Sequence, residues 1–200
     1  MAGLRAFLAV DLAPKIHAAL VRLKCELAAR APKVRWVHDE GLHATIKFLG
    51  TIAPAQLDAV RRILTPLVSE VVPFTAAVRG LGVFPSLKRP RVVWVGLHSD
   101  GLARLAELVQ QGIEPLGFAP EARPFRAHIT LGRIDAPQAW ARLLDALQAH
   151  WSDDFGTCQI GELCAYRSEL RPGGAVYSQL WTITFENNGG GISHGARSQS

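Results

Sequence analysis

The feature that most constrains this chain is a histidine followed two residues later by a threonine, within an apolar run, which occurs twice. The copies are LHATI at residues 42–46 and AHITL at residues 127–131. Because side chains alternate between the two faces of a β-strand, the histidine and the threonine of each copy share one face. The pattern predicts two strands that each bury an apolar face and present an imidazole beside a hydroxyl.

The same alternation assigns the neighbouring side chains to faces. Lys47 and Arg126 are expected beside His43 and His128, respectively, while Phe48 and Phe125 are expected on the core side of their strands.

Hydrophobic spacing indicates alternating helices and strands along the whole chain. We expect one helix ending near residue 30, one starting at Pro54, one carrying residues 102–109 and one from about residue 137 to 150. Pro66 leaves the last turn of the second helix open. Expected strands cover residues 5–12, 34–37, 42–49 closed by Gly50, 74–83, 92–97 as a central strand, 125–131, 158–166 and 176–185, with a turn at 172–174 joining the last two.

The order of these elements predicts an α+β fold of two similar lobes that face each other across a central cleft. Each half of the chain interleaves helices with strands and holds one of the two histidine–threonine pairs. Residues 1–186 are therefore expected to form a single bilobal domain. Residues 187–200 are rich in Gly, Ser and Asn and are expected to be a disordered tail.

Composition excludes several classes of protein. Among 200 residues, 48% are hydrophobic and 20% charged, as in a folded globular protein, and no apolar run is long enough to cross a membrane. The N-terminal apolar run is broken by Asp11 and lacks the cleavage site of a signal peptide. Cys25, Cys158 and Cys164 form no paired pattern, so we expect reduced thiols and a cytoplasmic location. The net charge of +5 permits nucleic acid binding without requiring it.

Two imidazoles that meet over one substrate can perform concerted acid–base catalysis near neutral pH, because histidine titrates there. Threonine hydroxyls can bind the oxygens of a phosphate as negative charge develops on them. This combination favours a ribonuclease-like reaction at a phosphodiester. No motif has the spacing of a zinc site, so neither a metal nor another cofactor is expected.

Five segments carry a resemblance to a known family. The chain resembles the 2H phosphoesterase superfamily and, within it, the bacterial RNA 2′,3′-cyclic phosphodiesterases formerly called 2′-5′ RNA ligases. The similarity runs in family order from about residue 5 to 185, through residues 5–12, 43–50, 84–94, 124–133 and 166–170.

The resemblance implies specific roles. His43 would protonate the departing ribose O3′, and His128 would deprotonate the attacking water. Thr45 and Thr130 would hold the phosphate oxygens, and Arg133 would add positive charge. The substrate would be RNA with a 2′,3′-cyclic phosphate end, the product a 2′-phosphomonoester, and the protein a monomer that acts without a metal or a membrane.

Other residues remain open between two interpretations. Lys47 and Arg126 are candidates for contact with phosphate, with a solvated lysine as the alternative at the first position. Phe48 is a candidate for base stacking despite its expected place in the core. The basic loop at residues 88–91 could guide an RNA backbone or be an ordinary solvated turn.

Two further functions fit the same residues. The site could run in reverse and join a cyclic phosphate to a 5′-hydroxyl, as a 2′-5′ RNA ligase. Alternatively, the protein could be a non-catalytic RNA-binding module whose histidines only donate hydrogen bonds. Small cyclic nucleotides and 2′-5′ oligonucleotides also remain possible substrates.

Overall fold

The computed structural model of the chain describes residues 3–135, 138–172 and 174–186. The expected tail at residues 187–200 and part of the expected turn at 172–174 lie outside the described residues. The helices are α1 (Pro14–Arg30), α2 (Pro54–Ser69), α3 (Asp100–Ile113) and α4 (Gln138–Gln148), with short 3-10 helices η1 (Asp39–Gly41) and η2 (Glu114–Leu116). The strands are β1 (Leu4–Val10), β2 (Arg35–Trp36), β3 (Ala44–Ile52), β4 (Phe74–Phe84), β5 (Val92–His98), β6 (His128–Arg133), β7 (Asp154–Ile160), β8 (Glu162–Arg171) and β9 (Gly174–Thr184).

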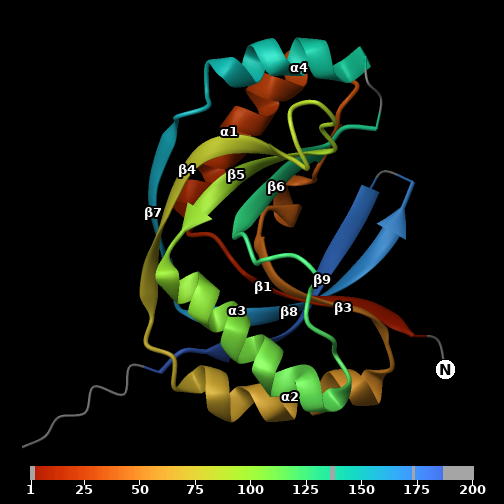
Figure 1. Cartoon of the computed structure of the whole chain (residues 1–200), viewed down its shortest axis with the longest axis vertical. Helices are drawn as coiled ribbons and strands as arrows, with labels where there is room; N and C mark the ends of the chain where they lie inside the picture. Colours follow the sequence, from red (N-terminus) through yellow and green to blue (C-terminus); the bar gives the residue numbers. More distant parts are fainter. Residues whose placement is uncertain (1–2, 136–137, 173, 187–200) are drawn as a thin grey trace, which may run out of the picture.

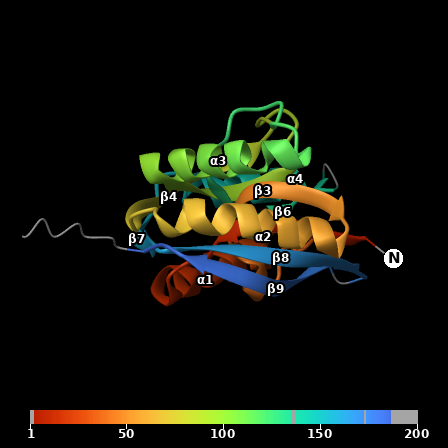
Figure 2. The ribbon, with the colours of Figure 1, turned by 90° about the horizontal axis from the view of Figure 1, so that it is seen from below.

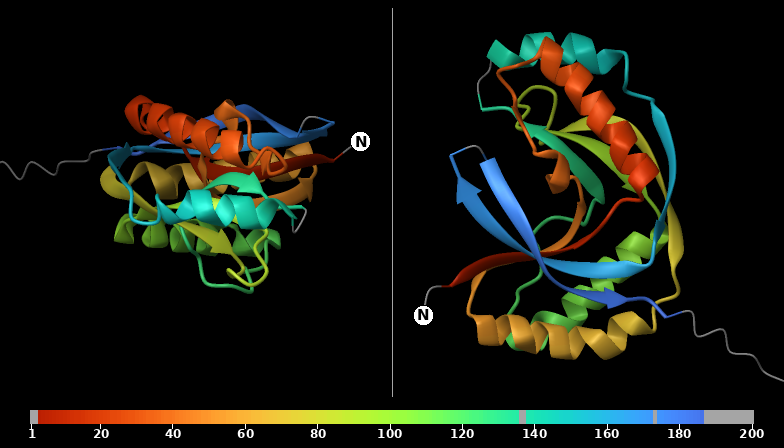
Figure 3. Two further views of the ribbon diagram at one scale, coloured as in Figure 1. Left: turned by 90° about the horizontal axis from the view of Figure 1, so that it is seen from above. Right: turned by 180° about the vertical axis from the view of Figure 1, so that it is seen from behind.

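All nine strands form one antiparallel sheet, which curls into an open arc (Figure 3). Its order is β7-β4-β5-β6-β3-β1-β8-β9, with β2 added beside β6. The two strands that carry the histidine–threonine pairs, β3 and β6, are neighbours in the middle of this order. The sheet therefore consists of two similar halves that meet at β3 and β6, which confirms the predicted α+β fold of two related lobes.

The lobes do not coincide with the two halves of the sequence. β4 precedes β5 and pairs with it, whereas β8 and β9 come late in the chain and extend the lobe of β1. Each lobe thus receives strands from both halves of the chain. This exchange ties the lobes together without a linker.

The helices cover the outer side of the curled sheet in two pairs (Figure 1). α1 packs against α4 and β7, while α2 and α3 pack together over β9 and β3, as Figure 2 shows for the second pair. α1 buries Ile16, Leu20, Leu23 and Leu27, whose spacing defines one helical face. No helix in the described ranges is long and apolar enough to cross a membrane.

The second helix differs in one detail from the expected pattern. α2 starts at Pro54 as predicted and continues past Pro66 to Ser69. Leu67 is partly exposed, and Val68 is buried in its place. Pro66 has no N–H group and gives up the one backbone hydrogen bond that its position would donate, and the helix continues for only three residues beyond it.

The single strand expected over residues 158–166 is two strands. β7 ends at Ile160 and pairs with β4 at one edge of the sheet, whereas β8 starts at Glu162 and pairs with β1 in the other lobe. Gly161 between them is where the chain crosses from one lobe to the other. β8 continues to Arg171 and forms a long hairpin with β9, visible in Figure 3.

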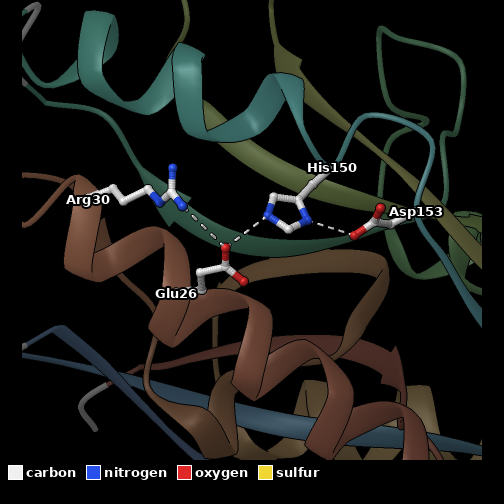
Figure 4. Close-up of polar contacts among 4 residues, drawn as sticks. All are labelled: Glu26, Arg30, His150 and Asp153. Carbon is white, nitrogen blue, oxygen red and sulfur yellow. Dashed lines mark hydrogen bonds and ion pairs between the residues drawn. The ribbon is translucent and has the colours of Figure 1, made fainter.

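A polar cluster fastens α1 to the segment that follows α4 (Figure 4). The His150 ring bonds through Nδ1 to Asp153 Oδ2 at 2.7 Å and through Nε2 to Glu26 Oε1 at 3.4 Å. Arg30 Nη2 lies 3.8 Å from the same glutamate oxygen. These bonds raise the pKa of His150, chiefly through its hydrogen bond with Asp153. The cluster is a structural contact between α1 and the segment that follows α4.

Candidate active site

The two lobes join at a single backbone pair, Ala44 in β3 with Ile129 in β6. Both side chains are fully buried in the core beneath the helices. The side chains of the residues directly before and after Ala44, and directly before and after Ile129, therefore point to the opposite, inner face of the sheet. In this antiparallel register His43 lies across from Thr130, and His128 lies across from Thr45. The structure thus brings both histidines and both threonines together on one face, all four partly exposed.

Each histidine is held by a backbone carbonyl two residues before it in the chain. His128 Nδ1 lies 2.7 Å from the carbonyl oxygen of Arg126. His43 hydrogen-bonds the carbonyl of Gly41, at the end of η1. A carbonyl only accepts, so Nδ1 of His128 must carry its proton toward Arg126. The Nε2 atom of His128 is consequently left with a lone pair.

Aromatic rings surround His43. Its imidazole stacks on Phe7 with 4.7 Å between ring centroids and on Tyr166 at 5.9 Å, and Tyr177 meets it edge-on at 5.1 Å. Phe48 lies further out, 6.2 Å from Phe7. These rings come from β1, β3, β8 and β9, so the whole first lobe contributes to the position of one imidazole.

His128 has its own aromatic contacts. Phe84, at the end of β4, meets the imidazole edge-on at 4.9 Å, and Trp94 of β5 lies at 6.4 Å. Both contacts restrict the tilt of the ring. His128 is therefore fixed by residues of the second lobe, just as His43 is fixed by residues of the first.

A β-bulge follows the threonine at the same place in both lobes. The register of β1 on β3 skips Ile46, and the register of β5 on β6 skips Leu131. The extra residue shifts the alternation of side chains by one. Phe48 is therefore 56% exposed on the side of Phe7, and Arg133 is exposed at the matching position of the other lobe. The expectation that Phe48 faces the core is wrong for this reason.

The bulge also changes the place of Lys47, which was expected beside His43. Its side chain is buried, with 6% of its surface exposed, and Nζ donates to the carbonyl of Ala119 at 2.8 Å. Glu121 lies 4.0 Å away. The lysine therefore fastens the loop that leads to β6, and its ammonium group is engaged there instead of beside the histidine.

The structure differs from two expectations just before His128: where the strand begins, and whether Phe125 is buried. β6 begins only at His128, so Phe125 is not part of the strand and is 37% exposed instead of buried in the core. Arg126 is exposed as well, and its backbone carbonyl holds His128. β3 has a second bulge, where its register on β1 skips Leu49, and the strand continues through Gly50, at a φ of 77°, to Ile52, beyond its predicted end.

Burial is the main electrostatic influence on both imidazoles. It lowers the pKa of His43 to about 4, while the Asp11 carboxylate raises it and the charge of His128 lowers it further. Burial also lowers the pKa of His128, against the hydrogen bond to the Arg126 carbonyl, and the Arg133 guanidinium adds to the lowering. Both rings are consequently neutral at pH 7 in the ligand-free protein.

The sequence patterns did not single out two polar residues of the site, Asp11 and Tyr166. The Tyr166 hydroxyl donates to Asp11 Oδ2 at 2.6 Å, while its ring stacks near His43. In the sequence Asp11 ends an apolar run, and both residues lie in segments that carry the family resemblance, which assigned neither of them a role. A carboxylate directly after a buried strand was the available signal, because it must be either solvated or paired there.

Three potential metal ligands lie together beside this pair. Atoms of Asp11, Glu162 and Cys164 are all within 4.8 Å of one another. Burial raises the pKa of the Cys164 thiol to about 12, and the Asp11 carboxylate already accepts the Tyr166 hydroxyl. Because a thiol must lose its proton to bind a metal ion well, this donor set is a poor fit for one.

Comparisons with known proteins agree with this arrangement. The model of the family described as LigT-like phosphoesterase matches the chain twice, over residues 10–94 and 95–177. Proteins called RNA 2′,3′-cyclic phosphodiesterase are similar along most of their length. The one from Methanothermobacter thermautotrophicus is 30% identical over 88% of this chain and 96% of its own. The one from Archaeoglobus fulgidus is 32% identical over 88% of this chain and 98% of its own. The one from Thermus thermophilus is 34% identical over 88% of this chain and 88% of its own.

Solved structures show the same fold. A crystal structure of a Thermus thermophilus protein superposes with a TM-score of 0.79 at 30% identity, covering 92% of this chain and 99% of that one. Escherichia coli LigT, crystallised with 3′-AMP, superposes with a TM-score of 0.72 at 23% identity, covering 92% and 98%. Each of the two matches of the family model contains one of the two histidine–threonine pairs, which the Ala44–Ile129 pair brings together. We call this junction of β3 and β6 the seam. The chain belongs to the LigT-like phosphoesterase family and is a hydrolase of the 2H type.

Proposed function

We propose that this protein hydrolyses the 2′,3′-cyclic phosphate ends of RNA to 2′-phosphomonoesters, with His43 as general acid and His128 as general base. The observation that carries the proposal is the Ala44–Ile129 pair, which places two imidazoles and two hydroxyls on one face across the seam. The similarity to several RNA 2′,3′-cyclic phosphodiesterases supports the choice of substrate.

His128 suits the role of base. Its Nδ1 proton is committed to the Arg126 carbonyl, so Nε2 is free to take a proton from water. The resulting hydroxide oxygen bonds to phosphorus as the bond from phosphorus to O3′ breaks. His43 gives its proton to O3′, which becomes a hydroxyl. The phosphate remains on O2′, and the next turnover requires a proton to return from His128 to His43 through solvent.

The threonines and Arg133 complete the site. Thr45 and Thr130 flank the histidines and offer hydroxyl donors to the two non-bridging oxygens of the phosphate. Arg133 lies close enough to His128 to lower the pKa of its ring, so its positive charge also reaches the place of the phosphate. The strain of the five-membered cyclic phosphate reduces the work that these groups must do.

The acid must carry a proton that burial disfavours. In the ligand-free protein the pKa of His43 is about 4. The negative charge of a bound phosphodiester raises the pKa of an adjacent imidazole, because it stabilises the protonated ring. We therefore expect a proton to be taken up at His43 as the substrate binds.

Other parts of the proposal concern the setting of the reaction. One chain supplies both histidines, so a monomer suffices, and RNA is the only partner required. Cys25, Cys158 and Cys164 are unpaired, which fits the reducing conditions of the cytoplasm. The single domain at residues 1–186 is part of the same proposal.

The test is digestion of a dinucleotide with a 2′,3′-cyclic phosphate, in the presence of EDTA, followed by chromatography of the monoesters against both isomers. We expect the 2′-phosphate in about 100-fold excess, which requires about 2.7 kcal/mol of discrimination between two bound orientations. A mainly 3′-phosphate product would contradict the assignment of acid and base. Complete loss of activity in EDTA would contradict the two-histidine reaction, and binding without turnover would favour an RNA-binding module.

A further inference from the structure

The two lobes differ at the position that faces each catalytic histidine from the neighbouring strand. In the second lobe that position is Gly96, which pairs directly with His128. In the first lobe Val10 pairs with Ala44, so the next residue, Asp11, lies across from His43. One histidine therefore faces a carboxylate, and the other faces a residue without a side chain.

The difference is built into the backbone. A Cβ atom added at Gly96 would lie 2.5 Å from His98 Nε2 and 2.7 Å from the carbonyl oxygen of Arg79. The second contact is with backbone and cannot be relieved by rotating a side chain. The second lobe therefore has no room for a counterpart of Asp11.

Asp11 is held in a defined position. Its Oδ2 accepts the Tyr166 hydroxyl at 2.6 Å and lies 3.7 Å from the Cys164 thiol. The ring of the same tyrosine stacks on Phe7 at 5.5 Å, and Phe7 stacks on His43. Asp11 and His43 are thus connected both across the strands and through one layer of stacked rings.

Apart from the two histidines themselves, the charged group that acts on each imidazole has the opposite sign in the two lobes. His43 is faced by Asp11 at the end of β1, by His128 from β6 and by the hydroxyl-bearing rings of Tyr166 and Tyr177 from β8 and β9. The Asp11 carboxylate is the strongest influence that favours the protonated ring. His128 has instead the positive charge of Arg133 beside it, which favours the neutral ring.

We propose that Asp11, held by Tyr166, is the positioning residue that stabilises the protonated form of His43 once the substrate is bound, and so makes His43 the acid and His128 the base. The proposal rests on the function proposed above. A pair of similar lobes presents two histidine–threonine pairs that could exchange roles. The carboxylate in one lobe and the glycine in the other remove this equivalence.

The first test needs no substrate. The side-chain signals of His43 and His128 are followed by NMR from pH 3 to pH 9 in the wild type and in Asp11→Asn, which keeps the acceptor for Tyr166 but removes the charge. We expect the pKa of His43 to fall clearly in Asp11→Asn, while that of His128 changes little. Glu162→Gln is the matched control, since it removes a carboxylate within 4.8 Å of Asp11 that does not act on His43. An unchanged titration of His43 in Asp11→Asn would overturn the proposal.

The second test uses turnover of the cyclic dinucleotide. In Asp11→Asn we expect kcat at neutral pH to fall about 10-fold for each unit by which the pKa of His43 falls, with KM unchanged or lower because a negative charge is gone. Lowering the pH should restore part of the loss. Asp11→Glu, which keeps the charge, should retain most of kcat, and equal losses in the Asn and Glu variants would indicate a merely structural role and overturn the proposal.

The two tests also separate this proposal from the proposed function. If the titration of His43 shifts as expected but the wild type does not open a cyclic phosphate, the proposed function is wrong and the influence of Asp11 on His43 still stands.

Discussion

Ala44 and Ile129 form the backbone pair that joins the two lobes, and each directly follows a histidine of the site. Because side chains directly opposite each other in such a pair are typically about 5 Å apart, the adjacent pairs set the distance between the catalytic groups. The geometry of the reaction therefore depends on the register of β3 and β6, and the aromatic rings and backbone carbonyls around each histidine have only to fix the tilt of its ring.

Replacing either histidine tests their roles. His43→Ala and His128→Ala are each expected to lower kcat by about 10²–10⁴-fold, the usual contribution of a general acid or base. Affinity for the RNA, measured by fluorescence anisotropy, should change little, because the threonines and Arg133 remain. His98→Ala is the control, since this exposed histidine bonds to the Arg79 carbonyl. Activity within a few-fold of the wild type in either site variant would contradict the assignment.

The pH dependence follows from the lowered pKa values. Activity requires a protonated His43, lost as the pH rises, and a neutral His128, lost as the pH falls. Both pKa values lie below the ordinary value of 6.5 in the ligand-free protein, so kcat/KM should be bell-shaped with both limbs below pH 6.5. The profile of kcat should lie at higher pH, because the bound phosphate raises both values. A flat profile of kcat/KM, or an alkaline limb well above pH 7, would not fit.

The buried lysine offers a test of the loop that precedes His128. Lys47→Met should lower the free energy of unfolding by about 1–3 kcal/mol, because the bond from Nζ to the Ala119 carbonyl is lost. We also expect kcat/KM to fall, since the loop leads into His128. Urea unfolding and steady-state kinetics measure the two effects, with the exposed Lys33→Met as control. Unchanged stability would mean that water replaces the ammonium group without cost.

The cluster around His150 predicts a pH-dependent contribution to stability. Its pKa is raised in the folded protein, so the interaction is fully present below pH 6.5 and is lost as the pH rises through the raised value. Asp153→Asn should therefore lower the melting temperature at about pH 5.5 and have little effect at about pH 9. An equal loss at both pH values would show that the charge of His150 does not matter.

Hydrophobic spacing was sufficient to predict most helices and strands, because each element must bury one face. The apolar positions of α1 and α3 and the apolar runs of β1, β4 and β5 are local features, and they predict these elements correctly. The division of residues 158–166 into β7 and β8 could not be predicted in this way. Both segments have strand character, and only their pairing with different neighbours separates them.

The candidate active site also combines features that the local sequence determines with features that only strand pairing determines. The repeated histidine–threonine pattern by itself determined that the histidine and the threonine of each pair share a face, because that depends only on alternation over three positions. The tertiary structure decided the rest. Strand pairing inserted the bulges at Ile46 and Leu131, which expose Phe48 and Arg133 and bury Lys47. It also placed Asp11 across from His43 and Gly96 across from His128, contacts between residues distant in the chain that no local pattern encodes.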